Sequence, residues 1–311
     1  MSTWQDRGLK DVASSYIAWY LFLAGAGGGA FVIGAFVDLA LRFKDPACLA
    51  RVSSVTDAGL VAGPALVALG SVFLVLDLGA PERAFAVFLS PVTSVLGFGA
   101  WSVAVFCFAA VGALVMGIVQ DTRTGRAVEF VLQVVAMAAA LCVIGYSGVF
   151  LSLWPAVPFL NTPFVPVLFT ASALATGAAV LIVVGFCRQN RPEVEEGLGG
   201  LVMLDLMLVV VEAGVLAAFL LASAQAGDAV GASADALMTG RFAGAFWLGA
   251  VGLGLAAPFV VDVASRRSFD PLVLAIGSCC TLAGGICLRY VLLLAAVRFN
   301  LVGMTPLPFW L

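Results

Sequence analysis

Two acidic residues, Asp205 and Glu212, lie seven positions apart inside a long apolar stretch, and Arg289 lies inside a later one. A spacing of seven places both carboxyl groups on one face of a helix. An ionisable side chain inside a membrane costs on the order of 2.5–3.5 kcal/mol, so each requires a reason. The pattern indicates a buried Glu212–Arg289 ion pair, a proton-handling group, or both at once. A helix from Gly200 would carry Glu212 roughly 16 Å from either end.

Asp77 is another ionisable residue whose placement in a membrane costs free energy. It lies at the end of an apolar stretch, in the sequence LDLGAPER (76–83). An acid at a helix C-terminus opposes the helix dipole, so capping does not explain it. Gly79 can end the helix, and Pro81 can begin a short interfacial helix. We therefore expect Asp77 at an interface, where it accepts a hydrogen bond or exchanges a proton with a ligand.

Other charged residues near the stretch ends have simpler structural explanations. Asp38 and Arg42, like Asp262 and Arg266, have the i,i+4 spacing of a helical ion pair. Glu129 is predicted at a helix N-terminus, where the dipole favours an anion.

The elements that carry these residues must be membrane helices. The chain has 311 residues, of which 63% are hydrophobic and 11% charged, against about 45–50% and about 25% in ordinary globular domains. The apolar runs are continuous rather than alternating, which favours helices over a barrel. The sequence predicts an all-α integral membrane protein in a lipid bilayer.

Composition also argues against several functions. Histidine is absent from the sequence, whereas membrane b-type haems are held by paired histidines, so we expect no haem. The seven cysteines show no C-x-x-C spacing, which argues against an iron–sulfur cluster or a metal site in this protein. No basic patch suggests nucleic-acid binding, and the long first apolar run is interpreted as an uncleaved span.

Eight apolar runs bounded by charge or proline are candidate spans. They are 15–41, 57–76, 95–119, 129–153, 164–187, 200–224, 242–265 and 271–297. Loops after odd-numbered spans hold nine Lys or Arg residues and the opposite face holds five. By the positive-inside rule, both termini should face outward.

The aromatic residues are one-sided. By position within these spans, all six tryptophans and all four tyrosines lie on or near the predicted outer face. An ordinary aromatic belt decorates both interfaces, so the cluster indicates a docked partner, a planar ring ligand or an uneven belt. The glycine-rich run 25–30 in the first span offers close packing to neighbouring helices, or room for a flat ligand.

Several motifs resemble the NrfD/polysulfide-reductase membrane-subunit family. LDLGAPER (76–83) resembles its D-L-G-x-P-E-R signature, and YLFLAGAGGG (20–29) its glycine-rich first span. GYSGVFLSL (145–153) with NTP (161–163) resembles its fourth span and outer loop, and PVLFTASALATG (166–177) the start of its fifth. Asp205, Glu212 and the Leu288-Arg289-Tyr290 segment match its polar positions. The resemblance covers nearly the whole sequence.

This resemblance implies a fold and partners. Family members have two four-helix bundles, here 15–153 and 164–297, with an outer N-terminal segment 1–14, an outer loop 154–163 and an outer tail 298–311. They carry no haem and exchange electrons between membrane quinone or menaquinone and a ferredoxin-like iron–sulfur subunit on the outer face. That subunit serves a catalytic subunit of molybdopterin type. The implied location is the bacterial cytoplasmic (inner) membrane.

The same resemblance implies site residues. The quinone site would lie in the first bundle, with Tyr146 as hydrogen-bond donor to a quinone carbonyl and Asp77 as its proton-exchanging neighbour. Tyr20 occupies a position where some members have histidine, and Trp19 or Tyr16 could stack on the ring. The expected docking residues are Glu82, Arg83 and Trp154. The terminal substrate stays open among polysulfide, tetrathionate, nitrite, a sulfoxide and an organic acceptor.

Two other functions remain open. The intramembrane Asp, Glu and Arg residues would also suit a secondary transporter. A purely structural anchor that no longer exchanges quinone is the third interpretation.

Overall fold

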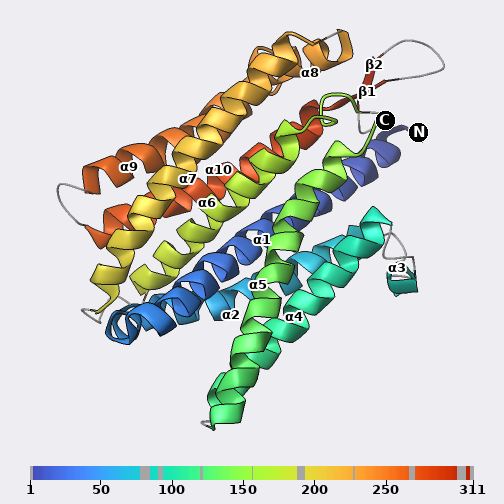
Figure 1. Cartoon of the computed structure of the whole chain (residues 1–311). Coiled ribbons are helices and arrows are strands. Elements are labelled where there is room, and N and C mark those ends of the chain that lie inside the picture. The colour runs from blue at the N-terminus through green and yellow to red at the C-terminus, as the bar shows by residue number, and fades with distance from the viewer. Residues whose placement is uncertain are drawn as a thin grey trace.

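The computed structural model is built almost entirely of helices (Figure 1). It describes residues 3–77, 85–89, 94–119, 122–155, 157–187, 193–226, 228–265, 270–299 and 306–308. The long helices are α1 (Thr3–Lys44), α2 (Pro46–Asp77), α4 (Val95–Val119), α5 (Arg123–Ser152), α6 (Phe164–Cys187), α7 (Glu193–Ala224) and α10 (Pro271–Ala295). A π-helix, η2 (Ala245–Ala256), continues into α9 (Ala257–Ser265).

Within the described residues, eight helices are long and apolar enough to cross a membrane. They span Ser15–Lys44, Val55–Asp77, Val95–Val119, Arg123–Ser152, Phe164–Cys187, Gly199–Ala224, Ala245–Ser265 and Pro271–Ala295. The predicted all-helical membrane fold and its eight spans are confirmed. The protein is a multi-pass integral membrane protein.

Several helices are longer than the apolar runs that predicted them. α1 begins at Thr3, so the predicted N-terminal segment 1–14 is largely helical. α2 begins at Pro46 and α7 at Glu193, in both cases several residues before the apolar run. An apolar run marks only the part of a helix that lies in lipid, whereas backbone hydrogen bonding continues into polar sequence. Proline at the first helical position sets the start of α2.

The seventh span was predicted as one α-helix and is divided between η2 and α9. Pro258 lacks an N–H group and its ring crowds the carbonyl four residues earlier, so regular α-helical bonding is interrupted here. A Cβ atom on Gly254 of η2 would lie 3.0 Å from the Cα of Gly284 in α10. The two glycines therefore let η2 and α10 approach backbone to backbone.

α1 is the central helix, and its consecutive glycines each face a different neighbour. A Cβ atom would meet Arg289 of α10 at Gly25, Gly63 of α2 at Gly27, Ile144 of α5 at Gly28 and Ala173 of α6 at Gly29. Consecutive residues are about 100° apart around a helix, so four glycines clear most of its circumference. Since apolar burial does not drive association in lipid, this close approach holds the helices together. The predicted packing role of the glycine-rich run is confirmed.

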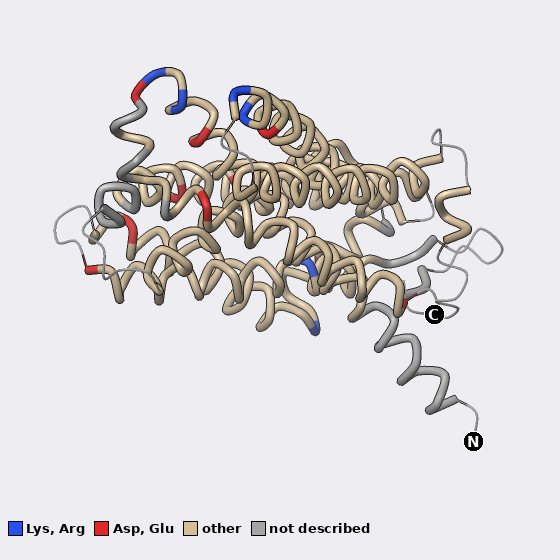
Figure 2. Tube along the Cα trace, turned by 90° about the horizontal axis from the view of Figure 1, so that it is seen from below, with Lys and Arg blue, Asp and Glu red and all other residues tan. Residues whose placement is uncertain are grey.

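The two ends of the helical array differ. α3 (Ala86–Leu89), α8 (Asp228–Met238) and the paired strands β1 (Val297–Phe299) and β2 (Pro306–Pro308) lie where α1 begins and α10 ends (Figure 1). We call this the aromatic end, because it carries Tyr16, Trp19, Tyr20, Trp101, Tyr146, Trp154, Trp247 and Tyr290. Figure 2 shows most of the charged residues at the opposite, charged end.

Candidate functional site

Tyr146 on α5 lines a cavity at the aromatic end. The residue is 9% exposed, and its ring lies against Gly99 of α4, where any Cβ atom would overlap it. The cavity has a volume of about 370 Å³ and is lined by Ser94, Val95, Phe98, Cys142, Gly145, Tyr146 and Val149. Among the described residues, the Tyr146 hydroxyl has no hydrogen-bond partner. It remains available to a ligand.

An aromatic series runs from this cavity to the end of α5. Tyr146 lies 6.5 Å from Phe98 and 5.8 Å from Phe150, measured between ring centroids. Phe150 in turn lies 5.5 Å from Trp154, the residue predicted to face a docked partner. The cavity and Trp154 thus lie at the same end of α5, with Trp154 just beyond the last helical residue.

Tyr20 on α1 lies close enough to Tyr146 for the two side chains to interact electrostatically. Tyr20 is 5% exposed. Sequence reasoning left its role open, and the structure places it beside the predicted quinone-binding tyrosine. The two phenols come from α1 and α5, which the glycines of α1 bring into contact.

Tyr16 and Trp19 were predicted to stack on a ligand ring. Both rings contact Phe73 of α2, at centroid distances of 6.1 Å and 6.2 Å. Trp19 is nearly parallel to Phe73, with 22° between the ring planes, and is 41% exposed. These rings therefore already have an intramolecular stacking partner.

Asp77 is the last residue of α2. Its Oδ1 atom is buried and has no hydrogen-bond partner among the described residues. No hydrogen bond joins it to Tyr146 within that part of the protein. Its predicted interfacial position is consistent with the end of the span, and the carboxyl group has an unused acceptor. The predicted docking residues Glu82 and Arg83 lie outside the described residues.

A second polar centre surrounds Arg289 on α10. Its side chain is 1% exposed and donates from Nη1 to the Gly285 carbonyl at 2.9 Å and to Ser172 Oγ of α6 at 3.2 Å. The guanidinium lies 5.8 Å and 5.7 Å from the ring centroids of Phe22 and Phe169. A Cβ on Gly25 would lie 2.8 Å from Nη2, so this glycine makes room for the cation.

Glu212 on α7 reaches this centre through Ser172, which hydrogen-bonds to its carboxylate, and it interacts electrostatically with Arg289. The sequence predicted a buried Glu212–Arg289 ion pair, and the two charged groups do interact electrostatically. The Ser172 hydroxyl lies between the two charged groups and bonds to both. Ser172 belongs to the PVLFTASALATG motif, but sequence reasoning assigned it no chemical role.

Asp205 lies on α7 seven residues before Glu212 and is 1% exposed. Neither of its carboxylate oxygens has a hydrogen-bond partner among the described residues. It interacts electrostatically with Asp262 of α9 and with Glu212. The sequence predicted the shared face of Asp205 and Glu212 but not the approach of Asp262, whose predicted partner Arg266 lies outside the described residues.

The charged end holds a third network, around Arg42 on α1. Its Nη2 atom contacts Asp38 Oδ2 and Glu129 Oε1, each at 2.8 Å. The predicted Asp38–Arg42 pair is confirmed. Glu129 was predicted at a helix N-terminus, but α5 begins at Arg123, so Arg42 rather than the helix dipole compensates it. Gln133 also donates to Asp38 Oδ2, at 2.8 Å.

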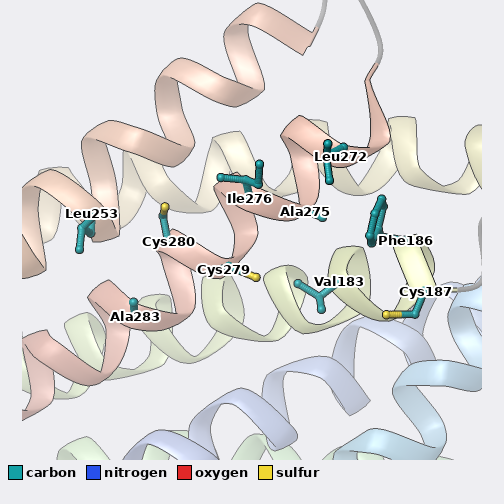
Figure 3. Close-up of a pocket in the computed structure, with 10 residues that line it drawn as sticks. All are labelled: Val183, Phe186, Cys187, Leu253, Leu272, Ala275, Ile276, Cys279, Cys280 and Ala283. Carbon is teal, nitrogen blue, oxygen red and sulfur yellow. The ribbon is translucent and has the colours of Figure 1, made fainter.

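An apolar pocket of about 510 Å³ lies between α6, α10 and η2 (Figure 3). Its lining includes the thiols of Cys187, Cys279 and Cys280 but no charged side chain. It therefore offers little to hold the oxygen atoms of a quinone. Among the described residues, no group of three or more His, Cys, Asp or Glu side chains is arranged to hold a metal ion.

The fold and these centres define a helical membrane protein with buried polar groups inside its spans. A family model described as "Polysulphide reductase, NrfD" matches residues 12–300, and the protein belongs to this family. It is 27% identical over 301 residues to the C subunit of polysulfide reductase from Wolinella succinogenes, an alignment that spans 91% of this sequence and 93% of that protein. It is 30% identical over 305 residues to protein NrfD of Escherichia coli, spanning 90% and 93%. The resemblance found in the sequence motifs is confirmed.

Proposed function

We propose that the protein is the quinone-active membrane subunit of a respiratory oxidoreductase complex. It would exchange electrons and protons between membrane quinone, such as menaquinone, and a docked iron–sulfur subunit. The observation that carries the proposal is the unpartnered Tyr146 hydroxyl in a cavity of about 370 Å³ at the aromatic end, among the residues that the structure describes. An apolar cleft with one oriented polar group suits a flat ring bearing carbonyl oxygens.

Each side chain of this site has a distinct role. When bound, the quinone supplies the two-electron, two-proton chemistry, which the amino acids here do not supply. Tyr146 donates a hydrogen bond to one ring oxygen, and Tyr20 fixes the position of the Tyr146 phenol from α1. Asp77 accepts or returns a proton at the interface through its unused Oδ1 acceptor. Rings along α5, and Trp19 on α1, shield the site from water.

The second polar centre suits proton transfer. Asp205 and Glu212 lie on one helix, and Ser172 connects Glu212 to Arg289. A hydroxyl group both donates and accepts, so Ser172 can relay a proton that a direct ion pair would hold fixed. We therefore assign Glu212 and Asp205 to proton handling during turnover, with Arg289 setting the local electrostatics.

The arrangement of partners is part of the same proposal. We assign α1, α2, α4 and α5 to one four-helix bundle, and α6, α7, η2 with α9, and α10 to a second. The charged end would face the cytoplasm of a bacterial inner membrane, in keeping with the positive-inside rule. A ferredoxin-like iron–sulfur subunit would then dock outside, on the aromatic end near Trp154, Glu82 and Arg83. A molybdopterin-type catalytic subunit would follow, and one relative is by name a part of polysulfide reductase.

Purification in mild detergent tests the function directly. A ferredoxin-like protein and a large catalytic subunit should co-purify with the protein, which by itself should show no haem bands in the visible spectrum. Quinol added to the complex should reduce the iron–sulfur partner. Failure of a quinone analogue to bind would leave a structural anchor instead.

The buried Asp205, Glu212 and Arg289 also favour a second candidate, a secondary transporter. The protein alone, reconstituted in vesicles, would then transport a solute in response to an ion gradient, with no redox partner. Such uptake would overturn the proposal.

A further inference from the structure

A second cavity lies at the charged end, far along α1 from Tyr146. It has a volume of about 410 Å³ and is enclosed by α1, α2, α4 and α5. Its lining residues are Phe31, Asp38, Arg42, Asp57, Leu60, Val61, Ala110, Ala113, Leu114, Gly117, Ile118, Glu129 and Gln133. One side is therefore charged and the other is aliphatic, which is the pattern of a site for an amphipathic molecule.

The charged side has more acceptors than donors. Two carboxylates, those of Asp38 and Glu129, share the single cation of Arg42. The Gln133 side chain is 1% exposed and gives Nε2 to Asp38, while its Oε1 atom has no donor among the described residues. Asp38 likewise accepts both of its bonds on Oδ2 and leaves Oδ1 without a donor there. An acceptor that lines a cavity without a protein donor can receive a hydrogen bond from a ligand, so the cavity suits a ligand that donates several hydrogen bonds and carries positive charge.

The cavity opens sideways rather than only toward water. Val61 and Ile118, on α2 and α4, are 52% and 85% exposed, and in a membrane span such residues face lipid. The charged groups lie near the ends of their spans, since Arg42 is two residues from the end of α1. Headgroups occupy that depth in a bilayer, and acyl chains lie beside Val61 and Ile118.

We propose that this cavity binds an aminophospholipid, with its primary ammonium group among Asp38, Glu129 and Gln133. A primary ammonium has three hydrogen-bond donors, which match the three side chains. The guanidinium N–H groups of Arg42 that do not contact Asp38 or Glu129 can meet the lipid phosphate. A choline headgroup has no N–H donor, and a glycerol headgroup has no positive charge. Phosphatidylethanolamine satisfies both requirements.

The test uses the full-length protein, purified in mild detergent and stripped of lipid. Binding of phosphatidylethanolamine, phosphatidylcholine and phosphatidylglycerol with identical acyl chains is measured by native mass spectrometry. Phosphatidylethanolamine should bind at least about tenfold more tightly than the other two, because a hydrogen bond to a charged group has that order of effect. Equal binding of the three lipids would overturn the proposal.

Two variants locate the site. Glu129→Gln removes one carboxylate, and Gly117→Leu fills the mouth, since a Cβ at Gly117 would point at Glu129 Cδ from 3.7 Å. Both should remove most of the preference for phosphatidylethanolamine. Asp235→Asn, at an exposed carboxylate on α8, and Gly214→Leu, at a glycine with nothing within 4 Å of its Cβ, should leave the preference intact.

Gly117→Leu decides the outcome if Glu129→Gln does not fold, because it keeps every charge and adds a good helix former. A full preference in Gly117→Leu would overturn the location. A last measurement tests whether free ethanolamine, at millimolar concentration, competes with the lipid for the cavity. Competition by ethanolamine at an affinity equal to that of the lipid would overturn the assignment to a membrane lipid, since the aliphatic wall would then contribute nothing.

Discussion

The Tyr146 cavity and the Arg289 centre both place a polar side chain against a glycine, but they differ in the hydrogen bonds that this side chain makes. In each, a glycine lets a large polar side chain lie against bare backbone: Gly99 for Tyr146 and Gly25 for Arg289. Arg289 then finds protein partners for Nη1 in Ser172 and the Gly285 carbonyl, while its Nε atom has none among the described residues. Tyr146 faces a cavity, and its hydroxyl has no partner among the described residues. We call the Arg289 group the satisfied centre because protein hydrogen bonds hold its Nη1 atom, and such a group maintains structure and charge. An unpartnered hydroxyl beside a cavity, as at Tyr146, is free to bind a ligand.

The largest expected effect comes from breaking the satisfied centre. Arg289→Gln leaves Glu212 without its compensating cation in a buried site, which typically costs about 3–5 kcal/mol. The thermal midpoint of the detergent-purified subunit should fall sharply, and less subunit should assemble. Arg123→Gln, at an exposed position on α5, is the control and should leave the midpoint within about a degree or two, as surface changes usually do. An unaltered midpoint in Arg289→Gln would contradict a structural role for this centre.

The open cavity should respond in the opposite way. Tyr146→Phe keeps the ring against Gly99 and removes only the hydroxyl, so the thermal midpoint should not change. Quinol-linked turnover of the assembled complex should fall about a hundredfold, the scale of losing a positioned proton donor. Tyr290→Phe is the matched control, because its hydroxyl is already bonded to Ser15. Equal turnover in both variants would remove Tyr146 from the site.

Glu212→Gln tests whether the satisfied centre also works in turnover. The amide still accepts a bond from Ser172, so we expect the subunit to assemble, but it cannot carry a proton. Quinone-linked turnover should slow about a hundredfold, at the low end for lost proton transfer. Loss of the folded subunit would favour a purely structural charge pair. Full turnover in a well-assembled variant would remove Glu212 from proton handling.

The sequence predicted the features that depend on its own local pattern. Apolar runs located the eight spans, because lipid imposes a length and a composition on each. The cost of a charge inside an apolar stretch identified Asp77 and Glu212, and motif order located the family and identified Tyr146. It could not predict the cross-helix geometry, in which Ser172 separates Glu212 from Arg289 and Arg42 compensates Glu129. Such contacts depend on how helices rotate and cross, which a single helix does not encode.

The π-helix shows the same limit. Pro258 marks a disturbance in the seventh span, but proline alone does not indicate that twelve residues, Ala245–Ala256, adopt π geometry. The glycines of α1 are intermediate: their number predicts close packing, while the identity of the four neighbours emerges only from the assembled fold.

The smallest expected effect concerns the glycine that lies against the polar side chain in each of the two regions. Gly99→Ala adds one methyl group where the Tyr146 ring now lies, so the ring must shift while its hydroxyl is retained. The KM for quinol should rise about threefold, equivalent to about 0.7 kcal/mol of binding, with little change in kcat. Gly214→Ala adds the same methyl group in open space on α7 and should change neither constant. Because Gly25→Ala would instead crowd the Arg289 guanidinium, it should lower the thermal midpoint more than Gly99→Ala does. The reverse order would mean that Tyr146, not Arg289, belongs to the satisfied structural centre.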